Sequence, residues 1–384
     1  MSASTRIVVI GGGIVAASVA YHLARRGVSV IIVAADHAGT ATDAGAGIIC
    51  PWADQGDDAG YRLAAEGARY YPELLAMLVG DGQADTGYAK VGALCVAAAA
   101  GAQQAAAAGA LQAAAARLRS RLAATPEIGE VAVLEPGGPA RMFPPLAGGL
   151  AGVWIAGGAR VDGRAIRDSL LRAAADRGAR RIRAAARLDL TAKRMTGVRA
   201  GADHIGADAV VVAAGAWTAQ VCAGVGWPLP IGPQRGQIVH ARLPGADTAG
   251  WPVVLPAGDP YLLGFPAGRI VLGATREDAG FEHAATIGGV GGLLTSALHL
   301  APGLARAALV ETRIGFRPVT ADGSPLLGPL AEGLLVAAGN GPQGLTAGPW
   351  TGRAAAALAL GEPPGTDVTA FDPARFSSGV QRSG

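Results

Sequence analysis

Short apolar runs of strand type alternate with amphipathic helical segments at both ends of the chain. Residues 6–10 (RIVVI) form a β-branched run that stops at three glycines, and a helical pattern then continues to Gly27, a residue type that often ends a helix. A second apolar run covers 28–33 and completes a segment with the size of a right-handed βαβ unit. The same order returns near the C-terminus, with an apolar strand at 334–338 and a helix at 345–360.

The centre of the chain has a different pattern. From about residue 227 to 313, short apolar runs are separated by proline- and glycine-rich turns, which is typical of an antiparallel sheet. Strands are expected at 91–97, 130–134, 208–214, 237–241, 261–265 and 269–272, and helices at 60–79, 97–124 and 163–178.

We therefore expect an α/β chain with a discontinuous, Rossmann-like dinucleotide-binding domain and a second, β-rich antiparallel domain that binds the substrate. The expected boundaries are 1–85, 155–225 and 315–384 for the first domain, and 86–154 and 226–314 for the second.

The turn after the first strand has the pattern Gly11-x-Gly13-x-x-Ala16. Gly11 allows the tight turn, Gly13 allows the backbone to approach a pyrophosphate, and the small Ala16 allows the helix to pack on the strand. The N–H groups at the helix start, around Ile14 and Val15, would then face the phosphates. The pattern predicts a dinucleotide site without separating NAD from FAD; a βα turn with no ligand is the alternative.

An acidic residue is expected at the end of the second strand, where it would bind a ribose hydroxyl. Ala34 occupies that position, and the nearest acid is Asp36. Either Asp36 serves through a different loop, or backbone groups make the ribose contact.

Composition narrows the class of protein. The net charge of +3 comes from 32 basic and 29 acidic residues and is too small to indicate a nucleic-acid partner. Cys50, Cys95 and Cys222 are widely separated, so neither a disulfide framework nor a metal site is expected, and a cytoplasmic location fits. No signal-peptide layout and no strongly apolar run of membrane-spanning length is present, so we expect a soluble protein with no membrane span.

Six further segments follow the glycine turn in order. They are TDAGAGII at 42–49, VDGR at 161–164, DAVVVAAGAWT at 208–218, RGQ at 235–237, GFRPVTADGSPLLG at 315–328 and AGNGPQGL at 338–345. Together they resemble the D-amino acid oxidase superfamily of flavoproteins. Within it, the motifs are most similar to those of glycine oxidases, sarcosine oxidase-like enzymes and D-amino acid dehydrogenases. The resemblance covers nearly the whole chain and implies an FAD-dependent oxidoreductase.

The resemblance also implies which residues contact FAD, which we expect to be bound non-covalently. The expected cofactor-binding set is Gly11, Gly13, Ile14, Val15, Ala34, Asp36, Thr42, Gly45, Ala46, Gly47, Ile48, Ala214, Gly215, Trp217, Arg317, Gly339, Asn340, Gly341, Gln343, Gly344, Leu345 and Thr346. The family often has histidine where this chain has Asn340. Backbone N–H groups of residues 344–346 would aim the positive end of a helix at the anionic edge of the reduced flavin.

Two residues are expected at the substrate. The resemblance places Arg317 where amino acid oxidases bind the substrate carboxylate, and a planar guanidinium suits that role. Tyr261 resembles the tyrosine that glycine oxidases place near the same carboxylate. The alternatives are a structural ion pair for Arg317 and a packed strand residue for Tyr261.

The expected reaction is hydride transfer from the carbon beside a neutral amine to FAD, giving an imine that hydrolyses. The substrate would be glycine, a D-amino acid or an N-methyl amino acid. The two lysines, Lys90 and Lys193, lie outside the 269–275 stretch where sarcosine oxidases use one, so dioxygen and an electron carrier both remain open as acceptors. One alternative is a dehydrogenase of the same fold that passes electrons to a quinone or a protein carrier. Another is a flavin-binding subunit with little amine chemistry of its own. An oligomer is possible. His37 is expected in a plain surface turn.

Overall fold

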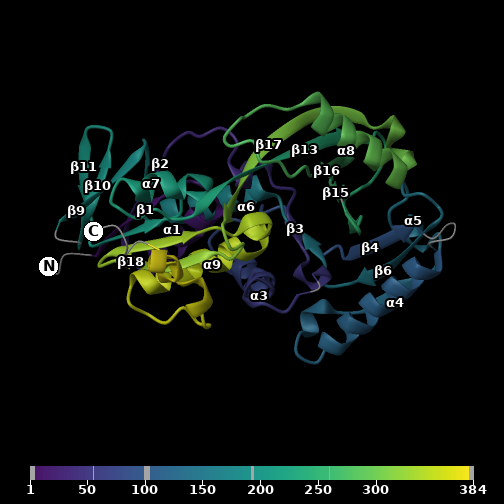
Figure 1. Cartoon of the computed structure of the whole chain (residues 1–384), viewed down its shortest axis with the longest axis horizontal. Coiled ribbons are helices and arrows are strands. Elements are labelled where there is room, and N and C mark those ends of the chain that lie inside the picture. The colour runs from purple at the N-terminus through teal and green to yellow at the C-terminus, as the bar shows by residue number, and fades with distance from the viewer. Residues whose placement is uncertain (1–4, 55, 99–103, 192–193, 259, 380–384) are drawn as a thin grey trace.

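The computed structural model describes residues 5–54, 56–98, 104–191, 194–258 and 260–379. A six-stranded sheet with the order β18-β19-β12-β1-β2-β8 forms one end of the molecule (Figure 1). All neighbours in it are parallel except β18 and β19. Its strands are β1 (Arg6–Ile10), β2 (Ser29–Ala34), β8 (Arg180–Arg183), β12 (Ala209–Val212), β18 (Leu326–Ala331) and β19 (Leu334–Ala338).

The central strand β1 is buried on both faces, which is why its sequence is continuously apolar. Ile7 and Val9 pack in the core that holds the helices, and Val8 and Ile10 pack in the core on the opposite face. The helices of the first core are α1 (Ile14–Arg25), α3 (Ala59–Gly80), α6 (Gly163–Ala175) and α9 (Gly344–Ala359). The opposite face is covered by a three-stranded sheet of β9 (Ala186–Thr191), β10 (Arg194–Ala200) and β11 (Asp203–Gly206).

An eight-stranded sheet with the order β17-β13-β16-β15-β14-β4-β6-β5 forms the other part of the molecule. Its neighbours are antiparallel except for β14 and β4. The strands are β4 (Ala93–Ala98), β5 (Val131–Leu134), β6 (Leu150–Ile155), β13 (Ile231–Arg242), β14 (Val253–Pro256), β15 (Tyr261–Phe265), β16 (Arg269–Gly273) and β17 (Ala308–Thr320). Helices α4 (Gln104–Arg121), α5 (Gly138–Met142) and α8 (Ile287–Leu300) accompany this sheet.

Strands β13 and β17 form the longest ladder, from Ile231 opposite Thr320 to Arg242 opposite Ala308. The ladder forms the β17 edge of the eight-stranded sheet and is labelled in the upper part of Figure 1. Near its end the N–H of Phe316 donates to the carbonyl of Gly39, 2.9 Å away, in the loop that follows β2. A short helix, α2 (Ala41–Ala44), also packs against β17. The ladder therefore ties the antiparallel sheet to the loops of the parallel one.

Most expected elements are present. The strands predicted at 6–10, 261–265 and 334–338 coincide with β1, β15 and β19. The helix predicted from 163 begins after Asp162, whose carboxylate accepts the N–H groups of Arg164 and Ala165 as an N-cap.

Other expectations need correction. The central region is not purely β, because α8 lies within it. The strand expected at 237–241 is the end of the much longer β13, and part of the stretch expected as the 97–124 helix lies outside the described residues. The β-rich and dinucleotide-binding portions expected from the sequence correspond to separate sheets, but the exact domain boundaries stay a prediction, and 314/315 falls inside β17. In the residues that the structure describes, no helix has the length and apolar character needed to cross a bilayer.

We predict that Leu78→Ala lowers the free energy of unfolding by about 2–5 kcal/mol, because Leu78 is fully buried in the helical core and its loss leaves a cavity. The next residue of the same helix, Val79, is 60% exposed and provides the control. Val79→Ala should change stability by no more than about 0.5 kcal/mol. Urea unfolding of both variants and of the unmodified protein measures both changes; equal costs would show that the side of α3 carrying Leu78 is not buried.

Candidate active site

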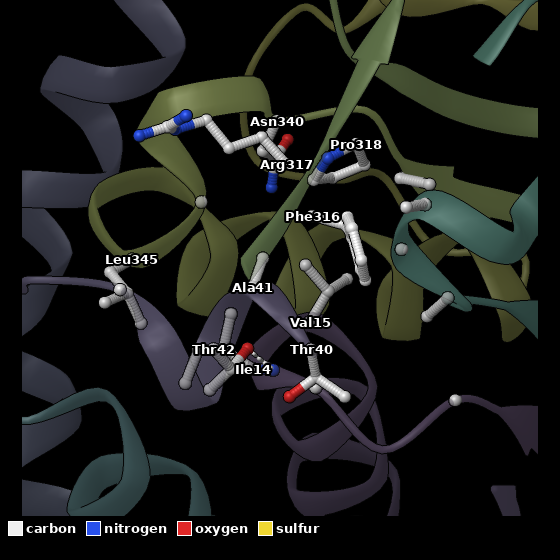
Figure 2. A pocket seen from close by; sticks show the side chains of 18 of the residues that line it. Ile14, Val15, Thr40, Ala41, Thr42, Phe316, Arg317, Pro318, Asn340 and Leu345 are labelled. Carbon is white, nitrogen blue, oxygen red and sulfur yellow. Dashed lines mark hydrogen bonds between the residues drawn. The ribbon is translucent and has the colours of Figure 1, made fainter. Parts of the chain in front are cut away.

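A cavity of about 880 Å³ lies where the carboxyl ends of the parallel strands meet the antiparallel sheet. This is the edge at which open α/β sheets bind ligands, and the volume is within the range of cofactor and ligand sites. Figure 2 shows Arg317 and Asn340 on one side of the view and Ile14 and Thr42 on the other. The wall comes from segments that are far apart in the sequence, which the fold brings together.

The cavity wall contains nearly all the site residues expected from the sequence. These are Gly11, Gly13, Ile14, Val15, Asp36, Thr42, Gly45, Ala46, Gly47, Ile48, Ala214, Gly215, Trp217, Tyr261, Arg317, Gly339, Asn340, Gly341, Gln343, Gly344 and Leu345. Ala34 and Thr346 are buried outside the wall. The hydroxyl of Thr346 donates to the carbonyl of Ile48, 2.9 Å away, so this side chain holds the neighbouring loop.

The glycine turn lies where β1, β2 and β12 meet. Gly11 donates its N–H to the carbonyl of Val33 at 2.9 Å and has φ +132°. A Cβ at this position would lie 2.2 Å from the carbonyl oxygen of Ala213, so only glycine fits. The N–H of Ile14 donates to the Thr42 hydroxyl at 3.0 Å, the contact dashed in Figure 2. That N–H is therefore already used, and the loop at 42 is fixed to the start of α1.

The end of the cavity near β2 is basic and aromatic. Arg181 of β8 and Arg187 of β9 line it together with Asp36. The His37 ring is exposed, as expected for a surface turn, but it also stacks on Trp217 with 4.3 Å between ring centroids and 5° between planes. Desolvation at this position lowers the pKa of His37. The two arginines were not expected, because β8 and β9 have polar sequences, and the places of β8 beside β2 and of β9 in the three-stranded sheet depend on the sheet order.

Arg317 and Tyr261 lie in the same wall, as expected. The guanidinium of Arg317 donates from Nη1 to the carbonyl of Thr275, 3.1 Å away. A Cβ on Gly236, in the paired strand β13, would lie 2.7–2.9 Å from the guanidinium atoms. The missing side chain of Gly236, the glycine of the RGQ segment, thus leaves the space in which the Arg317 guanidinium lies.

The outer residues of the RGQ segment hold the chain that follows β16. Arg235 is buried and donates to Glu277 at 2.5 and 2.9 Å and to Glu282 at 3.1 Å. Gln237 donates to Glu277 at 2.7 Å and accepts the N–H of Thr286 at 2.9 Å. Desolvation opposes ionisation of Glu277, yet hydrogen bonds with Thr275, Arg235 and Gln237 outweigh it and hold the pKa of the carboxyl below its usual value.

The position of Asn340 supports a polar ligand in the cavity. Its Nδ2 donates to the Thr351 hydroxyl at 3.3 Å, and only 6% of the residue is exposed. Its Oδ1 is buried and has no hydrogen-bond partner among the residues that the structure describes. A buried amide oxygen without a partner is costly, so a donor supplied by a bound group suits this place. The N–H groups of a flavin ring are such donors.

Two further observations concern attachment and metals. Cys50 lies in the cavity wall, and burial raises the pKa of its thiol far above the usual value, so the reactive thiolate is disfavoured. Over the described part of the chain, no group of three or more His, Cys, Asp or Glu side chains could hold a metal ion.

Comparison with known proteins identifies the class that this fold and site define. The family model described as "FAD dependent oxidoreductase" (DAO) matches residues 6–358. The chain therefore belongs to this family, and FAD is its cofactor. Relatives such as glycine oxidase and iminodiacetate oxidase act on C–N bonds, and the resemblance and the α/β fold class inferred from the sequence are confirmed.

Several relatives match over nearly their whole length. The oxidoreductase YurR of Bacillus subtilis (strain 168), whose reaction is uncharacterised, is 43% identical over 372 residues, which is 96% of this chain and 98% of YurR. The crystal structure of iminodiacetate oxidase (IdaA) from Chelativorans sp. BNC1 is 43% identical with a TM-score of 0.91, covering 96% of this chain and 99% of that one. Glycine oxidase from Geobacillus kaustophilus is 29% identical with a TM-score of 0.82, covering 97% and 99%.

We predict that Gly11→Ala lowers the FAD content of the purified protein at least several-fold. The added Cβ meets the Ala213 carbonyl, and φ +132° is strained for any other residue by about 1–3 kcal/mol. Flavin absorbance per mole of protein measures the effect, with circular dichroism to check folding. Gly206→Ala, in β11 with open space around the position, is the control and should keep its flavin. Full retention of FAD by Gly11→Ala would contradict the placement of the dinucleotide on this turn.

Proposed function

We propose that this enzyme oxidises the C–N bond of a small amine that carries a carboxylate, with Arg317 binding the carboxylate. The proposed substrate is glycine, a D-amino acid or an N-methyl amino acid, and dioxygen is the proposed acceptor. The observation that carries the proposal is the position of the Arg317 guanidinium. It lies in the cavity wall, donates to the Thr275 carbonyl and occupies the space that a side chain at Gly236 would fill. The similarity to iminodiacetate oxidase and glycine oxidase supports it, because both names describe oxidation of amino acids.

The geometry of Arg317 suits a carboxylate. A guanidinium offers N–H donors in one plane and can bind both oxygens of a carboxylate through parallel, charge-assisted hydrogen bonds. The contact with Thr275 fixes the orientation of that plane. Tyr261, in the same wall, pairs in register with Gly273, and its hydroxyl lies beside that residue. We propose that Tyr261 supports the same carboxylate.

FAD, when bound, supplies the acceptor for a hydride. The residues proposed to hold it are the glycine turn, the loop 42–48, the turn 214–217 and the segment 339–345. All of these residues except Ala44 line the cavity. The first turn of α9 lies in the wall, and its positive end would favour negative charge there. The hydroxyl of Tyr71 donates to the Leu345 carbonyl at 2.5 Å and fixes this turn from the helical core.

The residues around the substrate bind it, orient it and limit water. The Cα–H bond breaks with its electron pair leaving as hydride, the nitrogen lone pair forms the C=N bond, and an N–H proton goes to solvent. Water then adds to the imine, and the C–N bond breaks to give a carbonyl product and the released amine. Ile238 and Leu255 give the wall apolar surface near Tyr261, which favours the neutral amine that this reaction needs.

The identity of the electron acceptor depends on the residues near the flavin. Lys90 is not in the cavity wall, and Lys193 lies outside the described residues. Anaerobic reduction of the flavin by glycine, sarcosine, D- and L-amino acids tests the amine chemistry, and readmitting air tests dioxygen. Reoxidation of the flavin in air with formation of hydrogen peroxide supports an oxidase. Slow reoxidation in air, combined with fast electron transfer to a quinone, would favour the dehydrogenase. A flavin that no amine reduces would favour the flavin-binding subunit.

We predict that Arg317→Leu keeps FAD bound but lowers kcat/KM by about 10²- to 10⁴-fold. Two charge-assisted hydrogen bonds are worth about 3–6 kcal/mol together, and both would be lost. The measurement is the rate of anaerobic flavin reduction with the best substrate of the panel, together with flavin content. Unchanged reduction by every carboxylated amine would rule out the carboxylate role and leave the structural ion pair.

We predict that Gly236→Ala raises KM about tenfold or more, since the added methyl group would occupy the space of the Arg317 guanidinium. Gly232→Ala is the matched control: it lies on the same strand with no atom near the new Cβ. Steady-state kinetics on both variants give the comparison. If the two behave alike, the guanidinium does not need the place that Gly236 leaves.

A further inference from the structure

The end of strand β2 carries no acidic side chain. In dinucleotide-binding folds of this kind, an Asp or Glu at this place binds a ribose hydroxyl of the adenosine half of the ligand. Here the position belongs to Ala34, which is buried and has no polar group in its side chain. A side chain that binds the ribose therefore has to come from another part of the cavity wall.

The side chain of Arg181 lies close to both Ala34 and the glycine turn. Arg181 belongs to β8 and pairs in parallel register with Ile32, two residues before Ala34 on β2. A Cβ added to Gly12 would lie 3.3 Å from the Cβ of Ala34 and 3.6 Å from Nη2 of Arg181. Arg181 also lines the cavity. Its guanidinium therefore lies in the region where this fold binds the pyrophosphate and the adjoining ribose of a dinucleotide.

This end of the cavity has an excess of positive charge. Arg187 of β9 lines it as well, and both arginines are exposed. Among the residues that the structure describes, neither guanidinium has a hydrogen-bond or ion-pair partner. Of the three carboxylates in the wall, those of Asp43 and Asp54 already have partners, which leaves Asp36. A balance of one carboxylate to two guanidinium groups suits an anionic ligand.

We propose that Arg181 takes the place of the missing acid, so that the adenosine ribose is bound beside a cation and the ribose subsite accepts a phosphate group. A carboxylate at this place repels a phosphate on the ribose 2′-oxygen, whereas a guanidinium binds it through parallel, charge-assisted hydrogen bonds. Dinucleotide-binding folds distinguish NADP from NAD by the same exchange of an acid for an arginine. The inference does not depend on the substrate, because it concerns the half of FAD that accepts no hydride.

The first test compares two nucleotides as competitors of FAD. Adenosine 2′,5′-bisphosphate differs from AMP only by the phosphate on the 2′-oxygen. Each nucleotide is added to the holoenzyme, and the release of FAD is followed by the rise in flavin fluorescence. The bisphosphate should displace FAD at about tenfold lower concentration than AMP, and added salt should reduce this difference by screening the charges. A bisphosphate that displaces FAD no better than AMP, or not at all, would overturn the proposal.

Variants at residue 181 assign the preference to one side chain. Arg181→Gln should abolish the difference between the two nucleotides, and Arg181→Glu, which introduces a carboxylate, should make AMP the better competitor. Arg180→Gln is the matched control, because Arg180 is the preceding residue of β8 and is exposed, but lies outside the cavity wall. This control should keep the full difference. If Arg181→Gln keeps it too, the bisphosphate is bound by other groups and Arg181 does not replace the acid.

The second test measures the affinity for FAD itself. Serial dilution of each holoenzyme, followed by flavin fluorescence, gives the dissociation constant. Arg181→Gln should raise this constant about tenfold and make it less sensitive to salt, whereas Arg180→Gln should leave it unchanged. Asp36→Asn tests the alternative that Asp36 binds the ribose. If Asp36→Asn weakens FAD binding and Arg181→Gln does not, the ribose contact belongs to Asp36 and the proposal is wrong.

Discussion

The antiparallel pairing of β13 with β17 is the constraint on which the site depends. This ladder belongs to the eight-stranded sheet, yet β17 also binds the loop after β2 through Phe316 and packs against α2. It therefore sets the position of Arg317 relative to the glycine turn and the loop at 42–48. A slip of one residue in β17 would turn Arg317 to the opposite face of the sheet and out of the cavity. The register is continuous from Ile231 to His240, and this length makes such a slip costly.

Local patterns in the sequence predicted β1, β2, β12 and β19 of the six-stranded sheet, but not its two outer strands, β8 and β18. The run RIVVI is apolar because both faces of β1 are buried, and Gly11 is required by a close approach that involves neighbouring strands. Helix α8 was missed because four glycines in IGGVGGLLTSALHL resemble turn signals, whereas Thr286 caps the helix and Leu293 and Ala297 are buried. Strands β9 to β11 were missed because their exposed positions are polar and their only deep burial is against the six-stranded sheet.

The site was predictable where a motif is continuous and unpredictable where it depends on sheet order. Residues 42–48 and 339–345 were found as segments, but Arg181, Arg187 and Arg276 stand in polar stretches without a recognisable motif. These arginines line the cavity because of which strands become neighbours in the fold, and a short stretch of sequence does not reveal that order. The RGQ segment was recognised by resemblance alone. Its physical basis is that Arg235 and Gln237 hold the 275–286 chain, while Gly236 makes room for a side chain from the next strand.

The hydrogen bond from Arg317 to the Thr275 carbonyl has a consequence for how this active site can change over evolution. The acceptor belongs to the backbone, so a substitution at 275, 276 or 277 that shifts the main chain also moves the guanidinium of a residue some forty positions away. Effects of mutations at these places should be strongly epistatic and not additive. New substrate ranges are therefore more accessible when 236, 276 and 317 are randomised together than when one of them is varied alone.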